Sequence, residues 1–177
     1  MRRNFNGFSL YELLMTLALA ALLLAIGLPS FSSLRARSHQ AVEINALFHA
    51  FHLARKQSIM RRKVVSLCPS LDGESCLTSK DWSTGWIMFE NTDRDSPPHV
   101  DPGEIIVLAH DVADSVRIIA NRQGFTLRAT FKRATNGTFV FCDVRNRAAA
   151  KALIVSYTGR PRAAIARPDG QPYSCAE

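Results

Sequence analysis

Two arginines in the stretch TGRPR, Arg160 and Arg162, have the type and spacing to bind phosphate. Gly159 and Pro161 flank Arg160 and favour a turn there, and the proline stiffens the backbone. If the stretch is extended, side chains two residues apart project in the same direction. A guanidinium group donates paired hydrogen bonds to phosphate oxygens, at a lower entropy cost when it is held in place. The stretch indicates a polyanion contact, and a hairpin whose arginines face water explains it about equally well.

The charges of the chain are separated along the sequence, and the net charge is +7. The segment 72–114 holds ten acidic and two basic residues, whereas 117–170 holds eleven basic and two acidic ones. A basic surface can be solvated, can contact an acidic protein, or can bind a polyanion such as nucleic acid. If it binds nucleic acid, we expect smaller contributions from Arg167, Lys132 and Arg133.

Glu12 is the only charged residue in the apolar run from Phe8 to Leu28. A helix of about 20 residues spans a hydrocarbon core of about 30 Å, so this run predicts a membrane helix. An ionisable residue inside such a helix indicates a function. If the chain is cut after Gly7, the new amine of Phe8 lies one helical turn before Glu12. Each carboxylate can then pair with the amine of a neighbouring copy, unless Glu12 simply reaches the membrane surface.

The stretch GFSLYELL resembles the prepilin signature of type IV pilins and pseudopilins, which Gly7, Phe8 and Glu12 match. Tyr11 is a mild departure from the aliphatic residue of many members. The resemblance implies cleavage after Gly7 by a prepilin peptidase, N-methylation of Phe8, and packing with other pilin subunits into a filament. The basic leader MRRNFNG remains in the cytoplasm and directs the rest of the chain outward.

The expected organisation is a leader (1–7), a transmembrane or filament-core helix (8–30) and a periplasmic or extracellular globular domain (31–177). We expect a single-pass protein of the inner membrane with its C-terminal domain in the periplasm. After assembly, we expect the protein in a pilus filament at the cell surface.

The helix is expected to continue to about Arg61, with a kink or a locally melted turn near Pro29. Apolar residues form one stripe of this second half at helical spacing: Ile44, Leu47, Phe48, Phe51 and Ala54. His49 and His52 are suitably spaced for a metal. No further ligand accompanies them at helical spacing, so we interpret them as ordinary packed or exposed histidines.

After the helix, short segments rich in β-branched and aromatic residues predict strands. They are VVSLC, TGWIMFE, GEIIVLAH, SVRIIA, GFTLRATFK, GTFVFC and KALIVSY. Strands so close in sequence pair antiparallel, because parallel pairs need long crossovers. The fold class is α+β, with a long helix packed on antiparallel sheet, and the resemblance makes it pilin-like.

Four cysteines lie beyond the apolar run, which indicates two disulfides formed in an oxidising compartment. No C-x-x-C pair is present, which makes a metal site the weaker alternative. Four cysteines permit three pairings. The short separation favours a Cys68–Cys76 bridge around PSLDGES, which leaves Cys142–Cys175 to tie the C-terminal tail to a strand.

The stretches RKVVSLCPSLDGESC, WSTGWIMF and SYTGRPR are similar to the FimT/GspH branch of minor pilins and pseudopilins. Resemblance to FimT-like members implies that the protein captures double-stranded DNA in natural transformation. The stretch GRPR lies where the DNA-binding motif of such members is expected. The alternative is a structural minor pilin or a GspH-like pseudopilin of type II secretion, which contacts only protein.

No catalytic motif is present in the sequence, and we expect neither an enzyme nor a cofactor. The segment NTDRDSPPHVDP resembles the start of a calcium loop. It has Ser96 where such a loop needs glycine and Pro102 where it needs glutamate. An acidic turn without metal is the favoured interpretation.

Overall fold

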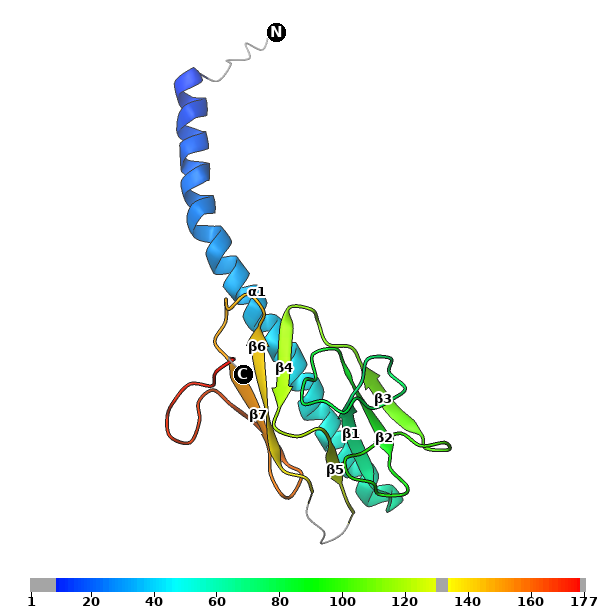
Figure 1. Ribbon diagram of the computed structural model, residues 1–177. Helices are drawn as coiled ribbons and strands as arrows, with labels where there is room; N and C mark the ends of the chain where they lie inside the picture. Colours follow the sequence, from blue (N-terminus) through cyan, green and yellow to red (C-terminus); the bar gives the residue numbers. More distant parts are fainter. Residues whose placement is uncertain (1–8, 130–133, 176–177) are drawn as a thin grey trace.

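A computed structural model describes residues 9–129 and 134–175, without the side chains of residues 28 and 29. One long helix, α1 (Leu10–Arg61), crosses two four-stranded antiparallel sheets (Figure 1). The first half of α1 stands clear of the domain, and the second half packs against it. This is the α+β fold that the sequence predicted.

Helix α1 is continuous through Pro29, so the locally melted turn is absent from the described backbone. Its axis changes direction between the exposed and the packed half (Figure 1). A proline inside a helix removes one backbone hydrogen bond and bends the axis without ending the helix. The helix ends at Arg61, and Arg62 follows as a left-handed cap with φ of 54°.

The packed half of α1 buries one stripe of side chains at spacings of three and four residues. The buried members are Ala36, Gln40, Glu43, Ile44, Leu47, Ala50, Phe51, Ala54 and Ser58. The predicted stripe is therefore confirmed except for Phe48, which is only half-buried. Phe48 still packs against the edge of the core, and its ring also contacts those of His49 and His52, which are both exposed.

The first sheet has the order β3-β2-β1-β5. Its strands are β1 (Val65–Pro69), β2 (Trp86–Glu90), β3 (Ile106–His110) and β5 (Phe125–Leu127). The second sheet has the order β4-β6-β7-β8. Its strands are β4 (Val116–Ala120), β6 (Gly137–Asp143), β7 (Lys151–Val155) and β8 (Pro161–Ala164). Each predicted segment contains a strand, and β8 is an addition that begins with a proline, which an edge strand tolerates.

The core lies between α1 and the two sheets and is centred on aromatic rings. Phe51 from the helix contacts Phe125 and Phe139, and Trp82 contacts the same two rings, with centroids 4.6–5.8 Å apart within the group. All four side chains are fully buried. Burying each contributes about 1.5–3 kcal/mol or more to stability, so this cluster joins the helix to both sheets.

Two buried glutamates tie the helix to the first sheet. Glu43 lies on the buried stripe of α1, and its Oε2 is 2.8 Å from Nε2 of His110. Glu90 on β2 accepts hydrogen bonds from Lys63 and Arg61 at the end of the helix. The bond from Lys63, with that from Arg61, holds the pKa of Glu90 below its ordinary value despite burial.

A third buried carboxylate organises the connection after β6. Arg147 donates to both oxygens of Asp143, through Nε at 3.1 Å and Nη2 at 2.9 Å. The backbone N–H of Arg147 adds a third hydrogen bond at 2.8 Å. The side-chain bond from Arg147 lowers the pKa of Asp143, although burial opposes the shift.

Two disulfides join Cys68 to Cys76 and Cys142 to Cys175, which is the pairing that the spacing favoured. The first closes the loop after β1. The second holds the C-terminal tail against β6, in the second sheet.

Peptide mapping of the unreduced protein should recover these two bridges and no others. Removing the second bridge by Cys142→Ala with Cys175→Ala should lower the free energy of unfolding by about 2–4 kcal/mol, because it closes a long loop. A peptide that joins Cys68 to Cys142 or Cys175 would contradict the fold.

The Asp143–Arg147 pair should make stability depend on pH. The pKa of Asp143 is lower in the folded chain, so its contribution is full above the unfolded value near 3.9 and falls as pH drops through the folded value. Asp143→Asn should cost about 1–3 kcal/mol at neutral pH and give a shallower acid limb in urea titrations. Because Glu90 titrates in the same direction, some acid sensitivity should remain. An unchanged profile would refute the role of Asp143.

Candidate nucleic-acid interface and assembly helix

Glu12 forms a capping box with Ser9 at the start of α1. The N–H of Glu12 donates to Oγ of Ser9 at 3.2 Å, and the N–H of Ser9 donates to Oε2 of Glu12 at 3.3 Å. A carboxylate in the first turn also interacts favourably with the helix dipole. This capping role was not predicted, although Ser and Glu at a spacing of three are the usual signature of a capping box. Gly7 and Phe8 lie outside the described residues.

The exposed half of α1 has no partner within the described chain. Its large apolar side chains from Leu10 to Ile26 are 47–75% exposed. The helix contains an 18-residue window with a mean hydropathy of 2.2, none of it buried, which is long and apolar enough to cross a membrane. Glu12 is therefore exposed near the start of an apolar rod that needs lipid or neighbouring helices around it.

Backbone hydrogen bonds fix the turn between β7 and β8, which carries Arg160. The N–H of Ser156 donates to the carbonyl of Arg160 at 3.1 Å, and the N–H of Arg160 donates to Oγ of Ser156 at 3.2 Å. Gly159 has φ of 73°, in the left-handed region that favours glycine. The side chain of Arg160 is exposed on this fixed turn.

Arg162 lies on β8, two residues after Arg160. Pro161 between them is buried and pairs with Val155, whereas Arg162 is exposed and pairs with Ile154. This alternation is the pattern of an extended segment with both arginines on one side. The β7–β8 turn and the short edge strand β8 thus each present one guanidinium group to solvent.

The β7–β8 turn packs against the connection between β5 and β6. The N–H of Ala134 donates to the carbonyl of Tyr157 at 2.9 Å. A Cβ atom on Gly159 would lie 3.0 Å from Leu127 and 3.4 Å from Ala134. The turn and this connection are therefore side by side, although they are distant in sequence.

A basic groove of about 690 Å³ also borders this connection, through Arg128 and Ala129. Its charged lining residues are Arg62, Lys63, Arg94 and Arg128. Arg55 of α1 donates a hydrogen bond to the carbonyl of Arg128 at 2.8 Å and fixes the groove to the helix. The sequence analysis missed this groove, although the run RRK at the end of the helix was an available indication.

The remaining predicted residues are less closely grouped. Arg167 is exposed on a separate hairpin after β8, where its N–H bonds to the carbonyl of Gln171 and its guanidinium lies 5.9 Å from the ring of Tyr173. Lys132 and Arg133 belong by sequence to the β5–β6 connection and lie outside the described residues.

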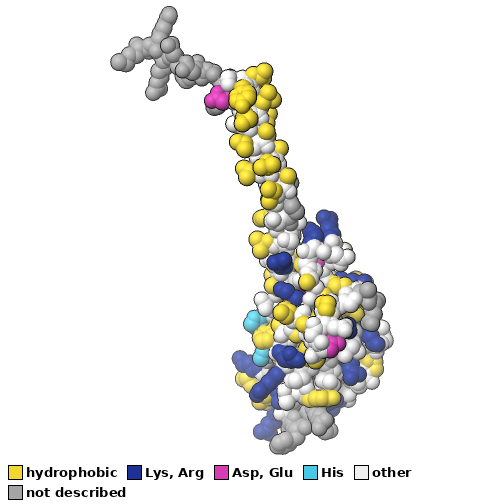
Figure 2. All heavy atoms as spheres, turned by 90° about the vertical axis from the view of Figure 1, so that its left-hand side faces the viewer, with side chains coloured by type: hydrophobic (Ala, Val, Ile, Leu, Met, Phe, Trp, Pro, Cys, Tyr) yellow, Lys and Arg dark blue, Asp and Glu magenta, His cyan; other side chains and the backbone are white. Residues whose placement is uncertain are grey.

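Acidic residues gather on the opposite sheet. Carboxylate oxygens of Asp93, Asp95 and Asp101, in the β2–β3 connection, lie within 4.8 Å of one another. Partial desolvation and the negative charges of Asp93 and Glu104 raise the pKa of Asp101. Figure 2 shows the other side of the molecule, where Lys and Arg side chains greatly outnumber acidic ones. The separation of charge along the sequence is thus partly a separation in space, although Arg94 of the basic groove lies between Asp93 and Asp95 in the chain.

A sequence profile of the family described as Type II transport protein GspH matches residues 43–159, which is more than half of the chain. The chain belongs to this family. The match covers α1 from Glu43 onward and seven of the eight strands, up to Gly159, one residue before Arg160. No curated protein matches the chain significantly.

Two solved structures are similar to this GspH-family fold. The minor pseudopilin EpsH from the Type 2 Secretion System of Vibrio cholerae gives a TM-score of 0.52 at 8% identity, covering 71% of this chain and 95% of that one. The type IV minor pilin FimU of Pseudomonas aeruginosa gives 0.50 at 19% identity, covering 78% and 92%. The predicted fold and the predicted kind of protein, a minor pilin or pseudopilin, are confirmed.

Glu12 can be tested with two variants that separate its charge from its capping role. Glutamine retains a capping box but has no charge, whereas alanine lacks both. We predict that Glu12→Gln and Glu12→Ala are both cleaved normally and both nearly absent from sheared filaments. A buried amine left without its carboxylate costs about 3–5 kcal/mol, so the loss should exceed about 100-fold. Normal incorporation of Glu12→Gln would show that Glu12 acts only as a cap.

Proposed function

We propose that this GspH-family protein is a minor type IV pilin that binds DNA without sequence preference for uptake in natural transformation. One observation carries the proposal: Arg160 and Arg162 are exposed on a turn that backbone hydrogen bonds hold fixed. The turn packs near β5, in the part of the domain farthest from the exposed half of α1 (Figure 1). The arginines are thus displayed away from the membrane or filament core.

The surroundings of the turn suit a polyanion. The β7–β8 turn and the basic groove flank the same β5–β6 connection, so cations from three segments face one end of the molecule. Phosphate contacts of this kind fix a duplex in place and carry little sequence information. A protein that takes up arbitrary DNA needs this property. Lys132, Arg133 and Arg167 are proposed as weaker contributors.

Assembly is proposed to follow the prepilin route. A prepilin peptidase cuts after Gly7 and leaves an amine on Phe8. The chain is anchored in the inner membrane through residues 8–30, with residues 31–177 in the periplasm. Pairing of Glu12 with the amine of a neighbouring subunit then offsets the cost of a buried carboxylate and draws the helix into a filament. The partners are other pilin subunits, and DNA after assembly.

The second candidate is a pseudopilin of type II secretion that contacts only protein. The family description, a type II transport protein, favours it. Both candidates share the helix, Glu12 and the disulfides. They differ in whether Arg160 and Arg162 serve any purpose beyond folding.

Binding of duplex DNA separates the two candidates. A fragment that begins at Phe31 keeps every buried core residue of the described chain, the first being Ala36. It should bind DNA in the non-specific range of roughly 10⁻⁴ to 10⁻⁶ M, with steep salt dependence. Several subunits on one filament raise the effective affinity by avidity. Changing Arg160 and Arg162 together to Gln should remove most binding and lower the salt slope by about 2.

The matched control changes Arg35 and Arg37 to Gln, which removes the same charge at the opposite end of the domain. That control should keep most of the binding, and both variants should keep the wild-type melting temperature, because exposed charges contribute little to stability. Equal gel-shift curves for the two double variants would show that DNA binding depends on the net charge of the domain and not on the position of Arg160 and Arg162. No binding by the wild-type fragment at low salt would favour the protein-only candidate.

A further inference from the structure

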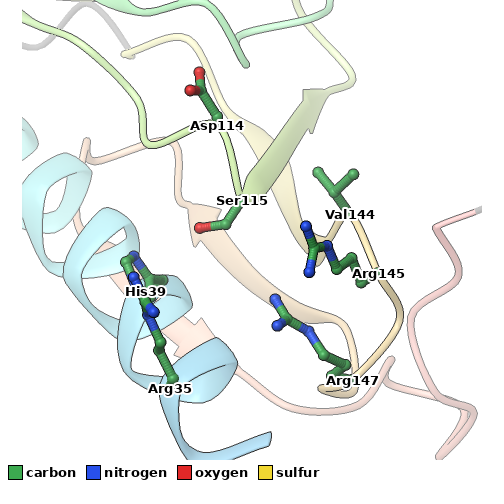
Figure 3. A pocket seen from close by; sticks show the side chains of 7 residues that line it. All are labelled: Arg35, His39, Asp114, Ser115, Val144, Arg145 and Arg147. Atoms are coloured by element: carbon green, nitrogen blue, oxygen red, sulfur yellow. The ribbon is translucent and has the colours of Figure 1, made fainter. Parts of the chain in front are cut away.

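A separate basic pocket lies where α1 enters the globular domain, at the end opposite the β7–β8 turn. Its volume is about 360 Å³. Three segments contribute polar side chains to its lining, shown in Figure 3: Arg35, His39, Asp114, Ser115, Arg145 and Arg147. The DNA-binding proposal uses none of these residues.

The charges of the pocket leave two arginines for a ligand. Arg147 is engaged with the buried carboxylate of Asp143. Arg35 donates through Nε to Nε2 of His39 at 3.3 Å, which does not neutralise its charge. Within residues 9–129 and 134–175, neither Arg35 nor Arg145 forms a salt bridge. Asp114 on the rim is exposed to solvent, so the pocket as a whole is positive.

A buried hydroxyl inside the pocket also requires a partner. Oγ of Ser115 is inaccessible to solvent and makes no hydrogen bond with the described residues. An unsatisfied buried hydroxyl costs about 1–3 kcal/mol. In Figure 3 it points toward the helix that carries Arg35 and His39, and the guanidinium groups of Arg145 and Arg147 lie on the side away from the helix. An anion with several oxygens would accept from this hydroxyl and from the arginines together.

The height of the pocket along α1 identifies the source of such an anion. If residues 10–29 cross the hydrocarbon core, Arg35 lies six residues further, or about 9 Å beyond it. The headgroup layer extends about 5–8 Å on each side of the core, within the length of an arginine side chain. Arg35 and Arg37 also lie on the translocated side, against the usual bias of basic residues toward the cytoplasm. A ligand on that surface explains their presence there.

We propose that this pocket binds the phosphate group of an anionic phospholipid in the periplasmic leaflet while the subunit is anchored in the membrane. The phosphate oxygens accept from Arg35 and Arg145, and from Oγ of Ser115 once that side chain rotates into the pocket. The lipid thereby fixes the tilt and rotation of the domain above the membrane before assembly. The inference rests on the membrane anchor and is independent of DNA binding.

The test uses the full chain in nanodiscs of phosphatidylcholine, with or without phosphatidylglycerol. At a lipid level about tenfold above its Kd, the melting temperature should rise by about 3–6 °C. Arg35→Gln should abolish the rise. Arg37→Gln is the matched control, because it removes the same charge at nearly the same height outside the pocket, and it should keep the rise. Ser115→Ala removes only the unpartnered hydroxyl and should reduce the rise without lowering stability in phosphatidylcholine.

Each other outcome overturns the proposal. Equal loss in Arg35→Gln and Arg37→Gln would mean attraction to surface charge rather than a pocket. The same rise on adding inorganic phosphate to phosphatidylcholine nanodiscs would assign the pocket to free phosphate. If phosphatidylglycerol does not raise the melting temperature and Arg35→Gln enters filaments poorly, the ligand of the pocket would be a carboxylate of a neighbouring subunit.

Discussion

One rigid helix serves two environments, and the rest of the molecule depends on that constraint. The exposed half of α1 presents apolar side chains that no part of the described domain covers. The other half buries its stripe in the aromatic core. Because the backbone is continuous from Leu10 to Arg61, the apolar half and the packed half belong to one helix, and the domain is joined directly to the apolar segment. One end of the domain must face that apolar environment, and the other must face away.

Glu12, the pocket around Arg35 and the β7–β8 turn follow one another along the direction of α1. Each lies in a different electrostatic environment. Glu12 lies where a carboxylate is costly unless a cation joins it. The pocket around Arg35 lies where α1 enters the globular domain, next to the apolar half of the helix (Figure 3). The β7–β8 turn and the basic groove lie at the far end, where soluble polyanions have access. The second disulfide and the pairing of β7 with β8 restrain the segments that carry the arginines of this end.

The features of the fold that depend on local sequence pattern could be predicted from the sequence. The helix, its buried stripe and seven strands follow from hydrophobic periodicity, and the nearer disulfide follows from its short loop. Strand β8 was missed because Pro161 and the adjacent turn residues obscure a strand that only edge pairing stabilises. The run RRK indicated part of the groove beside Arg128, but the complete groove and the pocket beside Arg35 could not be predicted. Their lining residues come from segments that only the tertiary fold brings together. Glu43 could be predicted only in part. Its burial follows from its place on the stripe of α1, whereas its partner His110 is distant in sequence and is brought to it by the tertiary fold.

The mass of the protein in purified filaments tests the central claim most directly, that this chain is a filament subunit assembled through its N-terminal helix. The account predicts a chain that begins at Phe8, carries one added methyl group on its amine, and retains both disulfides. A chain that still carries MRRNFNG, or a protein found in the membrane but never in filaments of cells that assemble them, would contradict it.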